Sequence, residues 1–260
     1  MNKFLLRALV LASVNIAVFA DAQFRTRNRM DKLEDFDEQK FSWGFYLNGN
    51  RLDYRIVLHP RYGSEGNQNL VKSKESYSFG AGLIAKWRLN DYLDLRLEPG
   101  LQFAQRQLIF DTQSNDQYAA GTLTNPPFTP IPLTDKDKTR DIKSTLVDVP
   151  VLLELHGNRW YNSRPYIAAG VNYVVNLQSN SDSEDDNMQQ VFRSTTHNFA
   201  WSAEMGIQFY FNKFKLTPAI RGTFFMNNEK VADNATTPPY WATAMSTLQT
   251  RAVMFVLKFE

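Results

Sequence analysis

The chain has 260 residues, with 29 Lys and Arg, 27 Asp and Glu, and a net charge of +2. A charge this balanced argues against a dedicated nucleic-acid binder, and the absence of cysteine excludes disulfides, Cys-ligated metals and a thiol nucleophile. The mean hydropathy of −0.41 excludes a bundle of transmembrane helices, yet Phe, Tyr and Trp make up 13% of the residues.

Residues 1–22 have the three parts of a secretory signal peptide. Lys3 and Arg7 are positive, the run from Phe4 to Phe19 is mostly apolar, and Ala20-Asp21-Ala22 precedes a cleavage point. The apolar run is too short for the alternative, a membrane anchor, so we expect the mature chain to start near Gln23.

Residues 23–40 form a polar segment with few apolar side chains to dock it. Three arginines at positions 25, 27 and 29 are followed by an acidic cluster within residues 31–38. We expect a flexible periplasmic N-terminal segment, with a partner-binding arm as the alternative.

From residue 41 onward, apolar and polar residues alternate with a period of two, which is typical of strands with two different faces. Eight such strands are predicted, over residues 41–48, 76–89, 93–103, 147–156, 166–176, 198–209, 214–224 and 252–260. Residues 52–58 alternate again after Asn48-Gly49, a common hairpin turn. They are either an extra strand or, as we prefer, an extension of the first strand with a phase shift or an extracellular ribbon.

Two all-β architectures fit this alternation: a sandwich that buries its apolar faces, and a membrane barrel that turns them to lipid. The predicted strands of about 10–14 residues suit the ~9–11 needed to cross a bilayer better than the ~5–6 of a sandwich strand. The polar faces carry Gly and charges of both signs, as the crowded interior of a small barrel requires.

The connections alternate in length, which is a second sign of a barrel. Residues 90–91, 157–163 and 212–213 are short connections, and residues 50–75, 109–144, 178–196 and 227–247 are long ones. We therefore predict that residues 41–260 form an all-β, eight-stranded antiparallel transmembrane β-barrel with four long extracellular loops and three short periplasmic turns. We place it in the outer membrane of a Gram-negative cell, in contact with outer-membrane lipid and with both termini periplasmic.

Two opposed faces also explain a polar average with many aromatic residues. Phe, Trp and Leu would face lipid, while Gly and paired charges would face the lumen. A periplasmic aromatic girdle is predicted near the short turns. Its members are Trp87, Tyr92, Trp160, Tyr161, Phe211 and Phe214.

Charged residues on the polar faces are expected to form a network inside the barrel, because eight strands leave room only for side chains or one small ligand. They are Lys86, Arg88, Asp94, Arg96, Glu98, Asp148, Glu154, Glu204, Lys215 and Arg221. Both signs are mixed, so the side chains can pair across the lumen, which favours a structural role. A narrow ion path or a buried acid/base site is the alternative.

No motif in the chain carries recognisable catalytic chemistry. The three histidines lack metal-ligand spacing, and no nucleophile elbow, phosphate loop or dinucleotide fingerprint occurs. His197 shares its predicted face with lipid-facing Phe199 and Trp201, but no outward serine can be placed beside it. We expect no enzyme, no catalytic residue, no metal and no cofactor; an outer-membrane enzyme or small-solute channel is the least favoured hypothesis.

Several segments resemble the PorT family of outer-membrane β-barrels in Bacteroidetes. The similar segments read FSWGFYLNGN, SFGAGLIAKWRLNDYLDLRLEPGLQF, STLVDVPVLLELHGNRWYNSRPYIAAGVNY and FKLTPAIRGTFF. The resemblance implies a non-enzymatic accessory of the type IX secretion system, with other secretion-system membrane proteins as partners. The alternative is a passive barrel for adhesion, surface binding or envelope integrity.

Overall fold

The computed structural model describes residues 32–58, 71–110, 134, 138–183, 191–232 and 242–260. The predicted signal peptide and residues 23–31 lie outside this part. Two short 3-10 helices are η1 (Glu34–Glu38) and η2 (Ala242–Ala244), and no helix of the described residues has the length and hydropathy of a membrane span. The strands are β1 (Phe41–Leu58), β2 (Val71–Lys74), β3 (Ser76–Arg88), β4 (Leu93–Leu97), β5 (Gly100–Phe110), β6 (Thr139–His156), β7 (Ser163–Asn176), β8 (His197–Tyr210), β9 (Lys215–Phe225) and β10 (Met245–Phe259).

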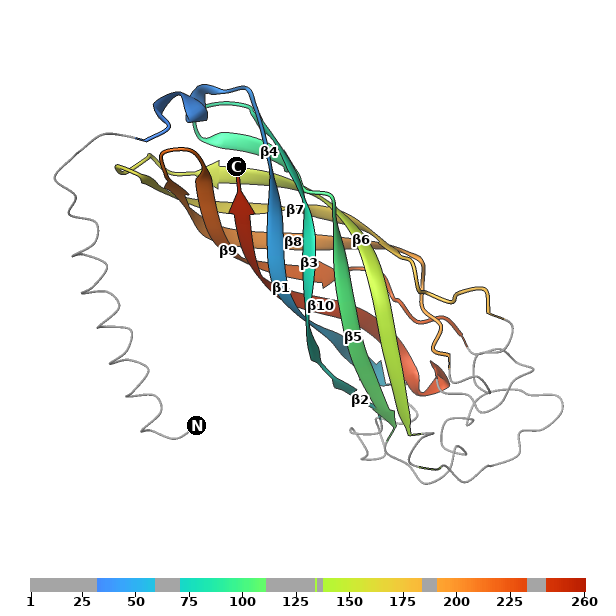
Figure 1. Ribbon diagram of the computed structural model, residues 1–260. Helices are drawn as coiled ribbons and strands as arrows, with labels where there is room; N and C mark the ends of the chain where they lie inside the picture. The colour runs from blue at the N-terminus through green and yellow to red at the C-terminus, as the bar shows by residue number, and fades with distance from the viewer. Residues whose placement is uncertain (1–31, 59–70, 111–133, 135–137, 184–190, 233–241) are drawn as a thin grey trace, which may run out of the picture.

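The strands form one antiparallel sheet that closes on itself, because β1 pairs with both β10 and β3 (Figure 1). β4 and β5 share one place in the ring: both pair with β3 and with β6, and only Glu98 and Pro99 separate them. The short β2 adds a pairing to β5 at one end. The ring has eight positions, which confirms the predicted eight-stranded barrel.

The strands are staggered around the ring. The row of paired residues that leaves β1 at Arg51 returns to β1 at Phe41, ten residues away. On the way it passes through Val253, Gly222, Ala203, Ala169, Leu153, Leu95 and Trp87. Such a stagger accompanies strands tilted by roughly 35–45° from the barrel axis. Closure also leaves the spanning wall without a free edge.

The two ends of the barrel differ. One end, called the turn end here, carries η1, the C-terminus and the short connections 89–92, 157–162 and 211–214 (Figure 1). The other, called the loop end, carries β2, η2 and the long connections. The short turns lie where the sequence predicted them. Three of the four long connections are shorter than predicted, because β1, β6 and β10 reach further toward the loop end, while the connection between β7 and β8 keeps about its predicted length. Parts of these connections lie outside the described residues.

The outer wall is apolar over most of its height. Trp43, Tyr77, Leu83 and Val171 are more than half exposed, as are many other large apolar side chains. Soluble proteins rarely show such a surface, whereas a bilayer covers it. The six aromatic residues predicted as a girdle are all exposed and lie at or near the turn end.

β1 shows that the outer surface changes character toward the loop end. Its inward and outward alternation continues without interruption to Leu58, so residues 52–58 extend the first strand and the expected phase shift was wrong. Leu52 and Tyr54 point inward and are 2% and 5% exposed, while Arg51 and Arg55 point outward. The hydropathy pattern reverses because the wall here leaves the apolar layer and meets water.

Candidate functional site

The lumen is filled at its centre by three cations and three carboxylates, all at most 4% exposed: Arg96, Arg221, Lys258, Glu98, Glu154 and Glu204. Arg221 Nε donates to Glu204 Oε2 at 2.7 Å and also contacts Glu98. Lys258 Nζ lies 2.8 Å from Glu98 Oε1 and also pairs with Glu204. Arg96 contacts all three carboxylates. The signs balance, so each buried charge has a partner, as burial in a low-dielectric interior requires.

Two tyrosines pack beside this cluster. The Tyr166 hydroxyl donates to Glu204 Oε1 at 2.7 Å, and Arg96 lies over the Tyr166 ring. Tyr46, on the opposite strand β1, is fully buried, and its ring centre lies 5.9 Å from Arg221 Cζ. Aromatic rings and paired charges together close the middle of the barrel.

Toward the turn end, smaller groups of charges continue the network. Lys86 Nζ lies 2.7 Å from Asp94, and His156 Nε2 lies 3.1 Å from the same carboxylate. Lys215 pairs with the C-terminal residue Glu260 at 2.7 Å. In the other direction from the central cluster, Asp148 accepts a hydrogen bond from Asn172 at 2.8 Å.

Of the ten charged residues predicted to line the lumen, Arg88 is the one that the structure places elsewhere. Its side chain is 28% exposed and pairs with Asp91 in the first short turn at 2.6 Å. Conversely, Lys258 belongs to the cluster but was missing from the prediction. Its place between outward Leu257 and Phe259 was a sufficient signal.

Arg106 was missed for another reason, because β5 runs past the predicted end of its strand at residue 103. Its guanidinium donates to Thr250 at 2.6 Å and to Ser144 at 3.1 Å, and lies 4.0 Å from the Tyr54 ring centre. Nearby Glu229, in the connection after β9, accepts the backbone N–H of Thr250. Burial raises the pKa of the Glu229 carboxyl above its usual value, and Arg106 opposes this rise.

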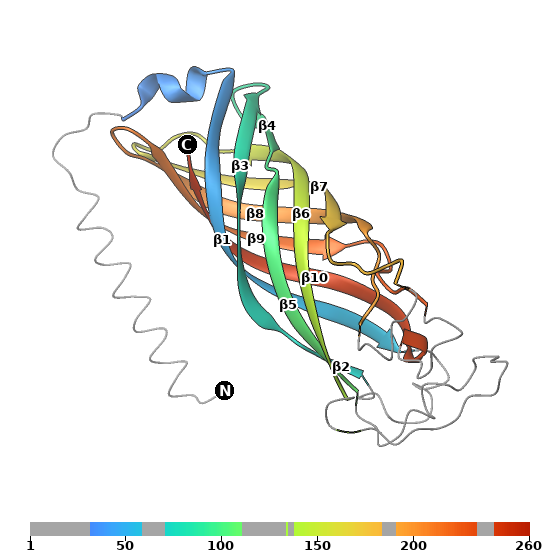
Figure 2. The same ribbon diagram turned by 45° about the vertical axis from the view of Figure 1, so that its right-hand side comes forward.

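Above Arg106 the lumen is apolar. Tyr54, Leu108, Phe110, Met245 and Leu248 form a cluster there, each at most 5% exposed. β1, β5, β6 and β10, which carry this cluster, run on past the ends of β7 and β8 (Figure 2). The barrel therefore holds a polar core at membrane height and an apolar core at its loop end.

At the turn end, residues 32–40 contact the barrel, although a flexible segment was expected there. Asp37 accepts a hydrogen bond from the Tyr210 hydroxyl at 2.8 Å and lies 3.4 Å from Arg164 and 3.6 Å from Arg159. Lys215 Nζ lies over the Phe36 ring, 4.9 Å from the ring centre. The segment is placed by charge pairing, which a reading based on its low apolar content did not anticipate.

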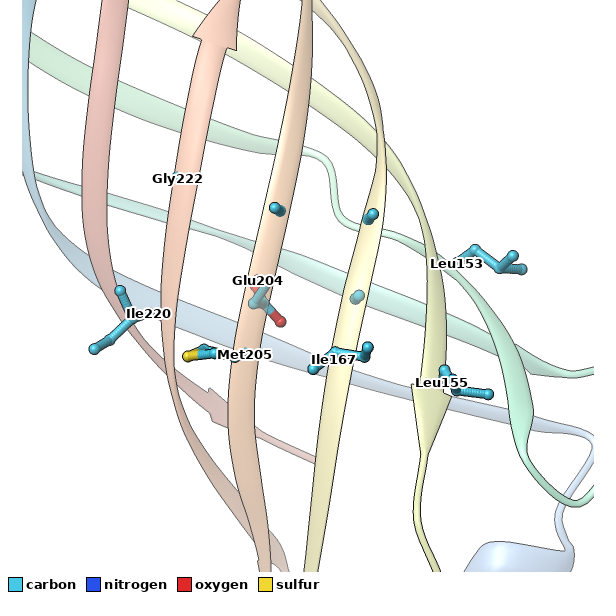
Figure 3. A pocket seen from close by; sticks show the side chains of 10 residues that line it. Leu153, Leu155, Ile167, Glu204, Met205, Ile220 and Gly222 are labelled. Atoms are coloured by element: carbon cyan, nitrogen blue, oxygen red, sulfur yellow. The ribbon is translucent and has the colours of Figure 1, made fainter.

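The outer wall has a shallow hollow of about 630 Å³ across β6 to β9 (Figure 3). Its floor is made by the small residues Ala169, Ala203 and Gly222, and larger apolar side chains such as Met205 and Ile220 stand beside it. Glu204 lies on the same strand as Met205, but its carboxylate belongs to the interior cluster. The hollow thus presents mainly apolar surface to lipid.

His197 lies on the outer wall near the loop end. Its Nδ1 is 2.7 Å from the Tyr173 hydroxyl, and the two rings are stacked with centres 6.0 Å apart. No serine contacts it among the described residues, which also contain no group of three or more side chains suited to a metal ion. The pair has the geometry of an interfacial aromatic contact.

Comparison with known proteins gives a family match. The sequence profile of a family described as "Outer membrane protein beta-barrel domain" matches residues 19–230. No curated protein sequence matches the chain.

Similar solved structures include three outer-membrane or surface proteins. OprG from Pseudomonas aeruginosa is 14% identical, with 84% of this chain and 91% of that chain covered and a TM-score of 0.38. Neisserial surface protein A is 10% identical, with coverages of 85% and 98% and a TM-score of 0.35. Ail of Yersinia pestis is 6% identical, with coverages of 85% and 99% and a TM-score of 0.36.

Proposed function

We propose that this chain, which belongs to the family of outer-membrane proteins with a β-barrel domain, serves as a non-enzymatic accessory of the type IX secretion system. That the protein is an outer-membrane β-barrel follows from the family and the fold. The secretion role is supported by the PorT-like segments, of which residues 144–173, in β6, β7 and the turn between them, are the longest.

The closed lumen limits the form that a secretion role can take. Six paired charges and two tyrosines fill the centre of the barrel, and an apolar cluster fills the loop end. An eight-stranded barrel is too narrow for a protein cargo even before its lumen is filled. A secretion role therefore has to use the surfaces of the barrel, and the protein would scaffold or assist a larger translocon.

The proposal includes an orientation in which the turn end faces the periplasm. Short turns on the periplasmic side and long loops outside are usual for bacterial outer-membrane barrels. The charged side chains that face outward from the loop-end wall, such as Arg55 and Lys143, then stand in the extracellular medium.

Deletion of the gene tests the secretion role. We expect cargo with the C-terminal signal to remain inside the cell while the outer membrane keeps its barrier to detergent and large antibiotics, and a plasmid copy should restore export. Undiminished export in the deletion strain would rule the role out. Co-purification from native outer membranes in mild detergent should also bring down a much larger barrel subunit.

A passive surface barrel is the second candidate, and the loop-end extension favours it. The extension presents charged side chains on a rigid wall, as a surface-binding protein would. In this case the deletion strain would export cargo normally and would lose attachment or envelope integrity instead.

A further inference from the structure

The turn end contains a built site for a carboxylate. Arg159, Arg164 and the Tyr210 hydroxyl converge on Asp37 from the β6–β7 turn, from β7 and from the end of β8. All four side chains are mostly buried. Two guanidinium groups and one hydroxyl around a single carboxylate form a charge-assisted arrangement of the kind that recognises anionic ligands.

The barrel itself positions these arginines. Arg159 Nε donates to the Tyr161 carbonyl at 2.8 Å. Arg164 donates to the carbonyls of Gly157 at 3.0 Å and of Asp91 at 3.1 Å. These contacts do not involve the N-terminal segment, so the site is preorganised for a ligand.

The site also forms hydrogen bonds with the main chain of the bound segment. Arg159 donates to the carbonyls of Lys32 and Leu33, and the Asn162 side chain accepts the backbone N–H of Lys32 at 2.9 Å. A carboxylate contact combined with contacts to carbonyl and N–H groups identifies the ligand as a short acidic peptide segment.

The bound segment is held in a way that permits exchange. Leu33 adopts φ 54° and ψ 51°, a left-handed conformation that costs a non-glycine residue of order 1–3 kcal/mol. Tyr161 in the receiving turn has φ 54° as well. The contacts that oppose this strain include ion pairs whose side chains are 10–19% exposed, so water still reaches them.

We propose that the turn end is a receptor site for acidic peptide segments, which residues 32–37 occupy in the isolated chain and which an acidic segment of a periplasmic protein takes over by exchange. The periplasmic source of the partner rests on the orientation given under the proposed function. The binding reaction itself does not depend on the secretion role.

The absence of cysteine allows a specific test on the full mature chain. A nitroxide label on Glu38→Cys, an exposed position next to Asp37, reports whether the segment is bound. The competitor is a synthetic peptide with the sequence of residues 31–39, DKLEDFDEQ, and the control peptide carries Asn in place of the aspartate equivalent to Asp37. Folding is checked by heat-dependent gel migration in every variant.

We expect a restricted label that becomes mobile, in a saturable way, when the acidic peptide is added. The control peptide should need a roughly tenfold or higher concentration, because it lacks the charge that both arginines contact. The double variant Arg159→Gln/Arg164→Gln should show a mobile label without peptide, whereas Lys213→Gln, an exposed cation in another turn, should behave as the parent.

Two results would overturn the proposal. The first is a label that stays restricted at millimolar acidic peptide. The second is equal displacement by the acidic and control peptides. Either result can occur while the deletion strain still loses secretion, so failure of the receptor site and failure of the secretion role are distinguishable.

Discussion

Individual charged residues in the lumen depend on their partners. Glu204 contacts Arg96, Arg221, Lys258 and the Tyr166 hydroxyl at once, so its removal leaves several buried donors and excess positive charge. A buried ion pair adds little net stability compared with an apolar pair, but breaking one is costly. The network therefore fixes one arrangement of the strands, since each displaced strand would separate a pair.

We predict that Glu204→Ala lowers the free energy of unfolding by about 3–5 kcal/mol, because it leaves buried cations without a counter-charge. Urea unfolding in lipid vesicles, followed by tryptophan fluorescence, measures the change. The matched control is Glu75→Gln, which breaks the exposed pair with Arg51 and should cost less than about 1 kcal/mol. Equal losses of unfolding free energy in the two variants would show that the interior network contributes no more to stability than an exposed ion pair.

Glycines make room for the two lumen tyrosines. A Cβ on Gly206 would lie 2.6 Å from the Pro218 carbonyl oxygen and 2.9 Å from the Tyr166 ring. A Cβ on Gly49 would meet no heavy atom within 4 Å.

Gly206→Ala should therefore destabilise the barrel by about 1–3 kcal/mol through overpacking. Gly49→Ala should stay within about 0.5 kcal/mol of the parent chain. The same urea titration compares both. A harmless Gly206→Ala substitution would mean that the Tyr166 ring does not need this space.

At the scale of elements, β1 combines two environments in one strand. Its first part turns Phe45 and Leu47 outward to lipid, and its second part turns Leu52 and Tyr54 inward. The alternation of the backbone is the same throughout, and only the solvent outside the wall changes. The apolar cluster at the loop end is thus built like the core of a soluble β protein.

Leu248 in β10 tests this second environment. It is fully buried in the loop-end cluster, so Leu248→Ala should lower the free energy of unfolding by about 2–5 kcal/mol. Its neighbour Thr247 points outward, and Thr247→Ala should cost at most about 0.5 kcal/mol. Denaturant titration distinguishes the two, and the reverse order would place the core on the other face of β10.

The sequence predicted the barrel because membrane height imposes one rule on all eight strand positions, apolar outside and polar inside. It was less informative beyond the membrane, where the inward-facing residues are apolar and the outward-facing ones are polar. Residues 52–58 therefore seemed to shift by one position, although their inward and outward alternation is unchanged. It placed most lumen charges on the inward face. It did not predict which charges pair, because partners such as Glu98 and Arg221 are far apart in the chain. The docking of residues 32–40 was missed because it depends on Arg159 and Arg164, which no local pattern connects with Asp37.

At the scale of the molecule, the packed lumen predicts that the barrel does not conduct. The purified mature chain in planar lipid bilayers should give no steady single-channel current, because charged side chains and tyrosines occupy the cross-section. A general-diffusion porin in the same bilayers is the positive control. Reproducible ohmic steps from the mature chain would mean that the network opens in a membrane.

The unequal strand ends have a consequence for neighbours in the membrane plane. On the side of β10, β1, β5 and β6 the wall extends further toward the loop end than on the side of β7 and β8 (Figure 2). The barrel wall therefore has a longer side and a shorter side. A protein beside the longer side meets outward-facing charged side chains such as Arg55 and Lys143, while one beside the shorter side meets the Tyr173–His197 pair near the loop-end limits of β7 and β8. A neighbour can thus distinguish the two sides by its contacts at the loop end alone.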